Sequence, residues 1–350
     1  MCSVPDTYIL PPAESRAIFE REIVPAEFGD LPDEVPGGDG PNNNNNNNND
    51  NNDNNDRAGT TVAVLVVGQT GAGKTRTAPL LQRALTARHG RVVHLVADTY
   101  KTYHPAFARL ARERPALASP GTGTDARRWL AMAARHAIRR RLPVLLESAC
   151  RHPGDFAELA RAFRDGGYRV EVAVMAVPEG LSRLGILTRF YERAREGAGG
   201  RLPARLTPKA VHDDSYAGLL EAAQFVDLSD AVDQVVVVRR DNLVSYVNER
   251  MEGHWRDPPL AAETICRERE RPLTDQEDED STRRLMRLRL MGTDALRAEL
   301  GEIEELLSPL APNNEETIFS PLRPLRLPCQ DHEGIDKEKE ADLCLGFVPS

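Results

Sequence analysis

The chain contains 350 residues, of which 40% are hydrophobic, and its net charge at neutral pH is −9. It can therefore bury a sizeable core, whereas it holds no run of about 18 apolar residues that would cross a membrane. Its five cysteines are far apart and form no CxxC pair, which disfavours a disulfide framework or a zinc site. We expect a soluble, cytoplasmic protein without a secretory signal.

The first segment, residues 1–35, contains one stretch with helical spacing of its apolar side chains. These side chains lie within residues 14–28 and are Ile18, Phe19, Ile23, Val24 and Phe28. The spacing predicts a short helix that packs on the main domain. Residues 36–58 follow and consist largely of Asn and Asp, with Gly and Pro near the ends. Because this composition offers almost nothing to bury, it predicts a disordered insert.

Residues 59–245 alternate between short apolar runs and longer stretches with helical spacing. The apolar runs are residues 61–67, 92–97, 144–146, 170–177 and 235–238, and the helical stretches are residues 75–88, 125–141, 155–165, 179–196 and 213–225. Nearly continuous apolar runs are typical of strands that are buried on both faces. The alternation predicts a three-layer α/β domain with a parallel sheet.

Two further segments complete the chain. Residues 246–310 are expected to form a helical C-terminal extension that covers one edge of the domain. Residues 311–350 are rich in Pro, Asn and charge and show no sustained period, which predicts a flexible tail.

A phosphate-binding sequence of the form GxxxxGK[ST] directly follows the first predicted strand and opens the first predicted helix. It consists of Gly68, Gln69, Thr70, Gly71, Ala72, Gly73, Lys74 and Thr75. The glycines allow backbone N–H groups to turn toward phosphate oxygens, Lys74 reaches the β- and γ-phosphates, and the Thr75 hydroxyl holds Mg²⁺. The sequence therefore predicts a P-loop NTPase or kinase fold that uses ATP and Mg²⁺.

Two carboxylates follow the next two predicted strands. Asp98 ends the second strand and Glu147 ends the third. Ligands gather at the carboxyl ends of parallel strands, so Asp98 is a candidate base that takes the proton of an acceptor hydroxyl. Glu147 is a candidate for binding substrate hydroxyls or, through water, Mg²⁺. The alternative for both residues is a helix N-cap.

Two arginines further along the chain are candidates for clamping the transferred phosphate. Arg189 lies in the helical stretch LGILTRFYERAREG, and Arg205 lies in the basic loop GGRLPARLTPKAVHDD. A loop of this kind after a helix is typical of a lid that closes over ATP. Each arginine could also be an ordinary surface residue. His104, followed by Pro105, is expected to be part of a structural turn and not catalytic.

The order of these segments resembles the zeta-toxin family of P-loop kinases. The resemblance rests on IFEREIVPAEFG, VVGQTGAGKT, VADTYKTYHPAF, LLESACR, GYRVEVAVMAVPEGLSRLGILTRFYER and RLTPKAVHDD, and it covers residues 14–240 around the Asn-rich insert. It implies a kinase that phosphorylates the 3′-hydroxyl of the amino sugar in UDP-N-acetylglucosamine. It also implies a small helical antitoxin as partner, which blocks the ATP site.

The resemblance implies a role for each matched residue. Lys74 and Thr75 would hold ATP and Mg²⁺, and Asp98 would be the base; the other matches are Glu147 and Arg151 for the nucleotide sugar, and Arg189 and Arg205 for the phosphates. Three positions depart from the family pattern, at Ser148, Ala149 and near Ala131, and all are on the substrate side.

The alternatives keep the fold and change the activity. One is a P-loop kinase that acts on another small molecule, on NAD or on a nucleic-acid end. With only 5% aromatic residues, a nucleic-acid acceptor is disfavoured, because single strands bind on stacking aromatics. The other alternative is an ATP-binding protein without catalysis.

Overall fold

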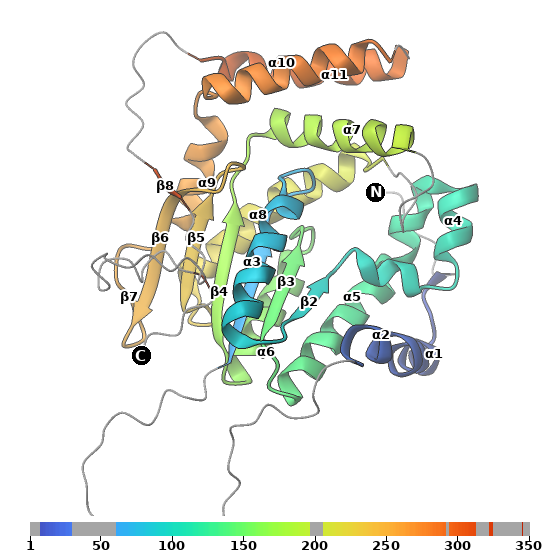
Figure 1. Cartoon of the computed structure of the whole chain (residues 1–350), viewed down its shortest axis with the longest axis vertical. Coiled ribbons are helices and arrows are strands. Elements are labelled where there is room, and N and C mark those ends of the chain that lie inside the picture. Colours follow the sequence, from blue (N-terminus) through green and yellow to red (C-terminus); the bar gives the residue numbers. More distant parts are fainter. Residues whose placement is uncertain are drawn as a thin grey trace, which may run out of the picture.

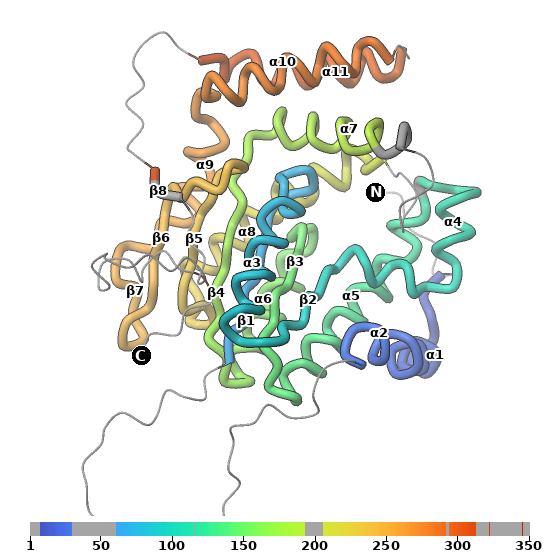
Figure 2. Tube along the Cα trace, viewed as in Figure 1, coloured from blue at the N-terminus to red at the C-terminus, as the bar shows by residue number. Residues whose placement is uncertain are grey.

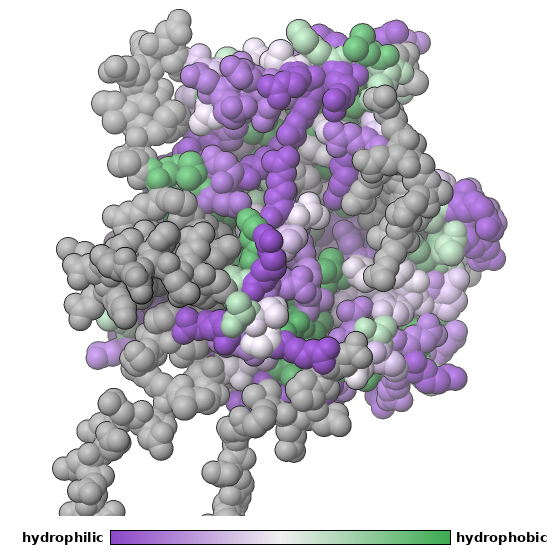
Figure 3. Space-filling view, in the orientation of Figure 1, coloured by the Kyte–Doolittle hydropathy of each residue, from purple (hydrophilic) through white to green (hydrophobic). Residues whose placement is uncertain are grey.

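The computed structural model describes residues 8–29, 61–196, 206–291, 294–312, 322–324 and 345. The predicted Asn-rich insert and most of the predicted tail lie outside these residues. Among the described helices, none combines the length and the apolar character needed to span a bilayer. The coloured surface in Figure 3 is mainly hydrophilic, with small separate apolar areas.

The centre of the fold is a parallel sheet of five strands. They are β1 (Val62–Val67), β2 (Val93–Val96), β3 (Val144–Ser148), β4 (Arg169–Met175) and β5 (Gln234–Val238), in the spatial order β2-β3-β1-β4-β5 (Figure 1). Each overlaps one of the predicted strands, with ends that differ by at most two residues. The predicted α/β fold with a parallel sheet is therefore confirmed.

Antiparallel strands extend the β5 edge of this sheet. The strand β6 (Leu243–Met251) pairs with β5, and the short strands β7 (His254–Trp255) and β8 (Arg323–Pro324) pair with β6. The predicted boundary between residues 245 and 246 therefore falls inside a strand, and residues 246–251 are not helical. The pattern missed β6 because most of its side chains are only half-buried, so it lacks a continuous apolar run.

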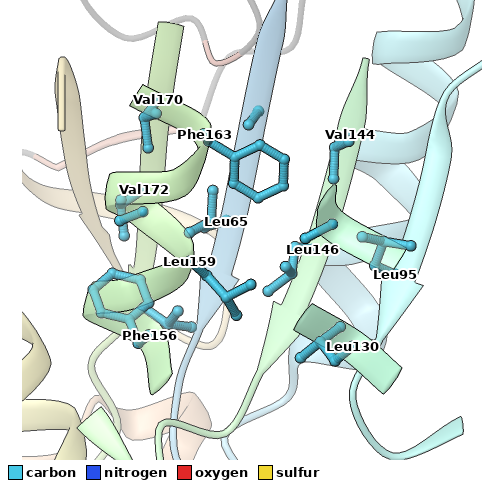
Figure 4. Packing of buried hydrophobic residues seen from close by; sticks show 14 of the residues in the cluster. Leu65, Leu95, Leu130, Val144, Leu146, Phe156, Leu159, Phe163, Val170 and Val172 are labelled. Carbon is cyan, nitrogen blue, oxygen red and sulfur yellow. The ribbon is translucent and has the colours of Figure 1, made fainter. Parts of the chain in front are cut away.

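Helices cover both faces of the sheet. On one face lie α5 (Pro115–Arg139), α6 (Pro153–Asp165), α8 (Lys209–Leu228) and α9 (Ala261–Glu270); on the other lie α3 (Lys74–His89) and α7 (Glu179–Glu196), over which α10 (Asp275–Arg289) and α11 (Asp294–Leu307) pack. In Figure 4 the side chains of Phe156, Leu159 and Phe163 lie over the strand residues Leu65, Val172 and Leu146. Strand residues alternate between the two cores, which gives the three layers.

The N-terminal helical segment lies beside α5 (Figure 2). It consists of α1 (Pro12–Ile18), a π-helical turn (Phe19–Ile23) and α2 (Val24–Phe28). Ile18, Phe19, Ile23 and Phe28 are buried in the core on the α5 side of the sheet. The indole Nε1 of Trp129 in α5 donates a hydrogen bond of 2.8 Å to the carbonyl of Ser15. The segment is therefore part of the same packed core.

Candidate functional site

The phosphate-binding loop connects the end of β1 to the start of α3. Gly71 has φ +83° and Gly73 has φ +107°, which is the left-handed region that favours glycine. A side chain at Gly71 would also collide with the carbonyl of Ser182 in α7. Backbone of this kind turns successive N–H groups toward one point and forms a nest for an anion, and the start of α3 adds partial positive charge.

Contacts from several elements hold this loop in place. The Thr70 amide donates to Ser215 Oγ of α8 at 3.1 Å, and Gln69 Nε2 donates to the carbonyl of Val177 at 2.6 Å. The Gly68 amide donates to the carbonyl of Ser148 at the end of β3. The loop is therefore held by the sheet and by α8 before any ligand binds.

The half-buried ammonium group of Lys74 lies within the loop. Its Nζ donates to the carbonyls of Gly68, at 2.5 Å, and Gln69, at 3.3 Å. Desolvation lowers the pKa of Lys74, while the negative charges of Asp98 and Glu147 act in the opposite direction. The positive charge of Arg189 in α7 lowers it further. The structure thus brings Asp98, Glu147 and Arg189 within electrostatic range of Lys74.

Glu147 lies at the carboxyl end of β3, in register with Val66 of β1 and Val96 of β2. Its side chain is buried, and Oε1 is 2.8 Å from Nε2 of His94 on β2. The next helix, α6, has His152 as its N-cap, so Glu147 is not a helix cap. The Glu147 carboxylate and the exposed hydroxyl-bearing residue Thr75 offer oxygen ligands of the kind that Mg²⁺ prefers.

Asp98 lies at the carboxyl end of β2, immediately before a 3₁₀ turn (Thr99–Tyr103). It occupies the N-cap position of that turn, but its side chain makes no capping hydrogen bond. Its carboxylate, 64% exposed, instead accepts a hydrogen bond of 2.5 Å from Nζ of Lys101. The same Nζ donates to Ser119 Oγ of α5 at 2.9 Å. Lys101 therefore holds Asp98 at the mouth of a pocket.

This pocket joins the phosphate-binding loop to the candidate base, because Thr70 and Asp98 both line it. Its inner wall is apolar and is formed by Ala126, Leu130, Phe156 and Leu159. Its polar lining includes the ion pair of Arg127 with Asp155 at 3.1 Å and Arg151, which pairs at 2.9 Å with Asp214 beside the pocket. The hollow can therefore hold an amphipathic molecule with its hydroxyl near Asp98.

The departures from the family pattern lie in or near this pocket. Ser148 and Ala149 line it, and α5 contributes no acidic residue to its lining. Cys150 also lines the pocket, and burial raises the pKa of its thiol to about 12.

Arg205 lies outside the described residues. His104 bonds to the backbone of Tyr8 and Ala106, as expected for a structural turn.

Sequence reasoning missed four residues that surround the site. They are His94, Lys101, Ser215 and Arg240. Lys101 could have been found, since it follows Asp98 by one turn. Ser215 and Arg240 belong to no motif around the loop, and their contacts with it depend on distant parts of the chain.

The strand order, the glycine nest after the central strand and the helices on both faces define a P-loop kinase-like protein. The zeta toxin family model matches residues 45–251, more than half of the chain, and the chain belongs to this family. The resemblance seen in the motifs is therefore confirmed.

Two relatives agree with this assignment. Toxin PezT of Streptococcus pneumoniae is 25% identical over 185 residues, which are 53% of this chain and 71% of PezT. A solved structure of the PezAT chromosomal toxin-antitoxin system of the same organism has a TM-score of 0.57 at 16% identity. That match covers 85% of this chain and 98% of the other, and it supports the fold.

Proposed function

We propose that this protein is a kinase that transfers the γ-phosphoryl group of ATP to a hydroxyl of a nucleotide-activated sugar, with UDP-N-acetylglucosamine as the expected acceptor. The observation that carries the proposal is one pocket lined by both Thr70 of the phosphate-binding loop and Asp98 at the end of β2. The charge of Asp98 also acts on Lys74. A phosphate donor and an alcohol can therefore meet between these two residues.

In the proposed reaction, the acceptor oxygen attacks the γ-phosphorus, the bond to the β-phosphate oxygen breaks, and ADP leaves. Asp98 takes the proton of the hydroxyl as the new bond forms. Lys74 stabilises the negative charge on the phosphates, and Arg189 of α7 is proposed to do the same. Arg205 is proposed for this role from the sequence motif alone. The apolar wall of the pocket excludes water, which would otherwise compete as acceptor.

Mg²⁺ would be held by the Thr75 hydroxyl, with the Glu147 carboxylate as a second oxygen donor. When bound with ATP, the ion neutralises part of the triphosphate charge. The contact with His94 fixes one oxygen of Glu147 at 2.8 Å, which leaves the other oxygen for the ion or its water.

The substrate side also supports a second candidate, a kinase for a different small hydroxyl compound. Ser148 and Ala149 differ from the family pattern and line the pocket, whose wall is largely apolar. As for partners, the related PezAT structure is described as a toxin-antitoxin system, and we propose that a small helical antitoxin regulates this chain as well.

The test is to incubate the protein with ATP and Mg²⁺ and a panel of nucleotide sugars, free sugars and NAD, and to follow each compound by mass. We expect one phosphate to be gained by UDP-N-acetylglucosamine, and the product to form far more slowly with the Asp98→Asn variant. Phosphorylation of another compound alone would move the assignment to the second candidate. If ADP forms with no compound in the panel, or does not form at all, the proposal is wrong.

A further inference from the structure

We infer that Arg240 is a positioning residue that holds the phosphate-binding loop open for the nucleotide, and that Gly185 of α7 is needed to give it room. The inference rests on the proposed use of ATP. It concerns a residue outside the loop, in the turn that follows β5, which lies two strands from β1 in the sheet.

Arg240 lies in the tight turn between β5 and β6. The turn closes through hydrogen bonds from the Arg239 amide to the Leu243 carbonyl and from the Asn242 amide to the Arg239 carbonyl. Asn242 has φ +65°, the left-handed conformation that such turns require. Thr77 of α3 donates to its side chain at 2.7 Å. The turn is thus attached to the helix that follows the loop.

From this turn the guanidinium group contacts the outside of the loop. Nη2 donates to the carbonyl of Gly71, and Nε donates to the carbonyl of Ala72 at 3.4 Å. In a trans peptide the C=O and the N–H point in opposite directions. Holding the Ala72 carbonyl therefore turns the amide of Gly73 away from Arg240, to the side where we propose that the phosphates bind. The Ala72 amide donates a hydrogen bond of 3.1 Å to the carbonyl of Gln69, which closes a turn within the loop.

Gly185 of α7 lies against both Arg240 and the loop. A Cβ atom at Gly185 would lie 2.5 Å from Nη2 of Arg240 and 2.8 Å from the carbonyl oxygen of Gly71. Both distances are shorter than a Cβ contact allows, so a larger residue would displace the end of the arginine side chain and press on the backbone of the loop. Glycine is unfavourable inside a helix, which makes this steric requirement the reason for its place in α7.

Arg240 differs from its neighbour Arg239 in its partners. Arg239 forms a buried bidentate ion pair with Glu268 of α9, at 2.6 and 3.0 Å, and so joins two elements of the fold. Arg240 donates to main-chain carbonyls, and within the described ranges no carboxylate lies at ion-pair distance from it. Burial lowers its pKa to about 10, and the charges of Arg284 and Arg76 act in the same direction. The charge of Glu277 opposes this shift in part. A net positive charge therefore gathers beside the loop, where it favours an anion.

The experiment measures binding of ADP and of inorganic pyrophosphate by calorimetry, with thermal unfolding of the free protein alongside. We expect Arg240→Met to lower the affinity for both ligands by about 10- to 100-fold, which corresponds to the loss of one or two charge-assisted hydrogen bonds. The ratio of the two affinities should not change, because the loss concerns the phosphates. Arg240→Lys should recover part of the loss.

Gly185→Ala is the second variant, because it leaves Arg240 in the chain. We expect a similar loss for both ligands, and no larger loss when it is combined with Arg240→Met, because both changes break one contact. The matched controls are Arg83→Met, an exposed arginine of α3, and Gly301→Ala in α11, where an added Cβ meets nothing within 4 Å. Both should bind like the wild type.

Wild-type affinity in Arg240→Met or in Gly185→Ala would overturn the inference, as would lower thermal stability with unchanged binding. If the wild-type protein itself binds neither ADP nor pyrophosphate, the proposed function fails and the inference fails with it. The wild-type measurement therefore separates the two failures.

Discussion

The two sides of the candidate site are built in different ways. The phosphate side consists mainly of main chain, to which Lys74 and Thr75 add side chains. It is held by hydrogen bonds with β3, α8, the β5–β6 turn and the segment just after β4. The acceptor side consists of side chains, several of them exposed and paired with one another, such as Lys101 with Asp98 and Arg151 with Asp214.

This difference determines which substitutions each side of the site tolerates. A backbone nest depends on left-handed glycines and on close contacts behind it, so most substitutions there alter its shape. A rim of exposed ion pairs contributes little to stability, so its residues can be exchanged while the frame stays intact. The departures from the family pattern at Ser148 and Ala149 are on this second side.

The strongest test of the phosphate side is Lys74→Met. We expect it to abolish ATP use, because no other ammonium group lies within the loop in the described part of the chain to meet the phosphate charge. ADP release and ATP affinity are the measurements. Lys209→Met, an exposed lysine that pairs with Glu302, is the control and should remain active. Activity near the wild-type level in Lys74→Met would refute the role of the loop.

Asp98→Asn tests the point where the two sides meet. We expect ATP binding to persist while transfer falls by about 10²- to 10⁴-fold, which is the usual contribution of a positioned base. Parallel measurements of ATP affinity and of the transfer rate separate the two effects. Equal rates for the variant and the wild type would remove Asp98 from the mechanism.

Arg151→Met tests the acceptor rim alone. Because the Arg151 pair with Asp214 is half exposed, we expect a rise of only about 3- to 10-fold in the KM for the acceptor and an unchanged affinity for ATP. The exposed Arg112, changed to Met in the same way, serves as control. A larger effect on ATP than on the acceptor would contradict the division into two sides.

A fall in pH should lower the stability of the protein through a histidine between α7 and α8, the helices beside the phosphate-binding loop. His212 of α8 is buried, 2.8 Å from Ser182 Oγ of α7, and burial lowers its pKa from the usual 6.5, although Asp213 opposes this. The folded state therefore binds this proton less readily than the unfolded state. Stability is kept above about pH 6.5 and is lost as the pH falls toward the lower folded pKa.

The expected slope is at most about 1.4 kcal/mol per pH unit for one such group. Denaturant unfolding between pH 8 and pH 5 measures it, and His212→Gln should reduce the loss. Burial also lowers the pKa values of His136 and His152, so His212→Gln should keep part of the loss. An identical slope in the variant would show that His212 does not contribute.

Features that depend on neighbouring residues could be predicted from the sequence. The five parallel strands contain short apolar runs, the loop from Gly68 to Thr75 is contiguous, and Asp98 and Glu147 lie at or just after the ends of strands. In each case the pattern and its physical cause lie within a few residues, and the rule that strand ends meet at one edge supplies the rest.

The contacts that prepare the site were decided by the tertiary structure. Arg240 and Gly71 are 169 residues apart, and Ser215 and Thr70 are 145 apart. The half-buried strand β6, which forms the turn that carries Arg240, has no apolar run to reveal it. Such contacts depend on how α7, α8 and the β5–β6 turn pack around the loop, and packing between distant segments leaves no periodic trace in the sequence.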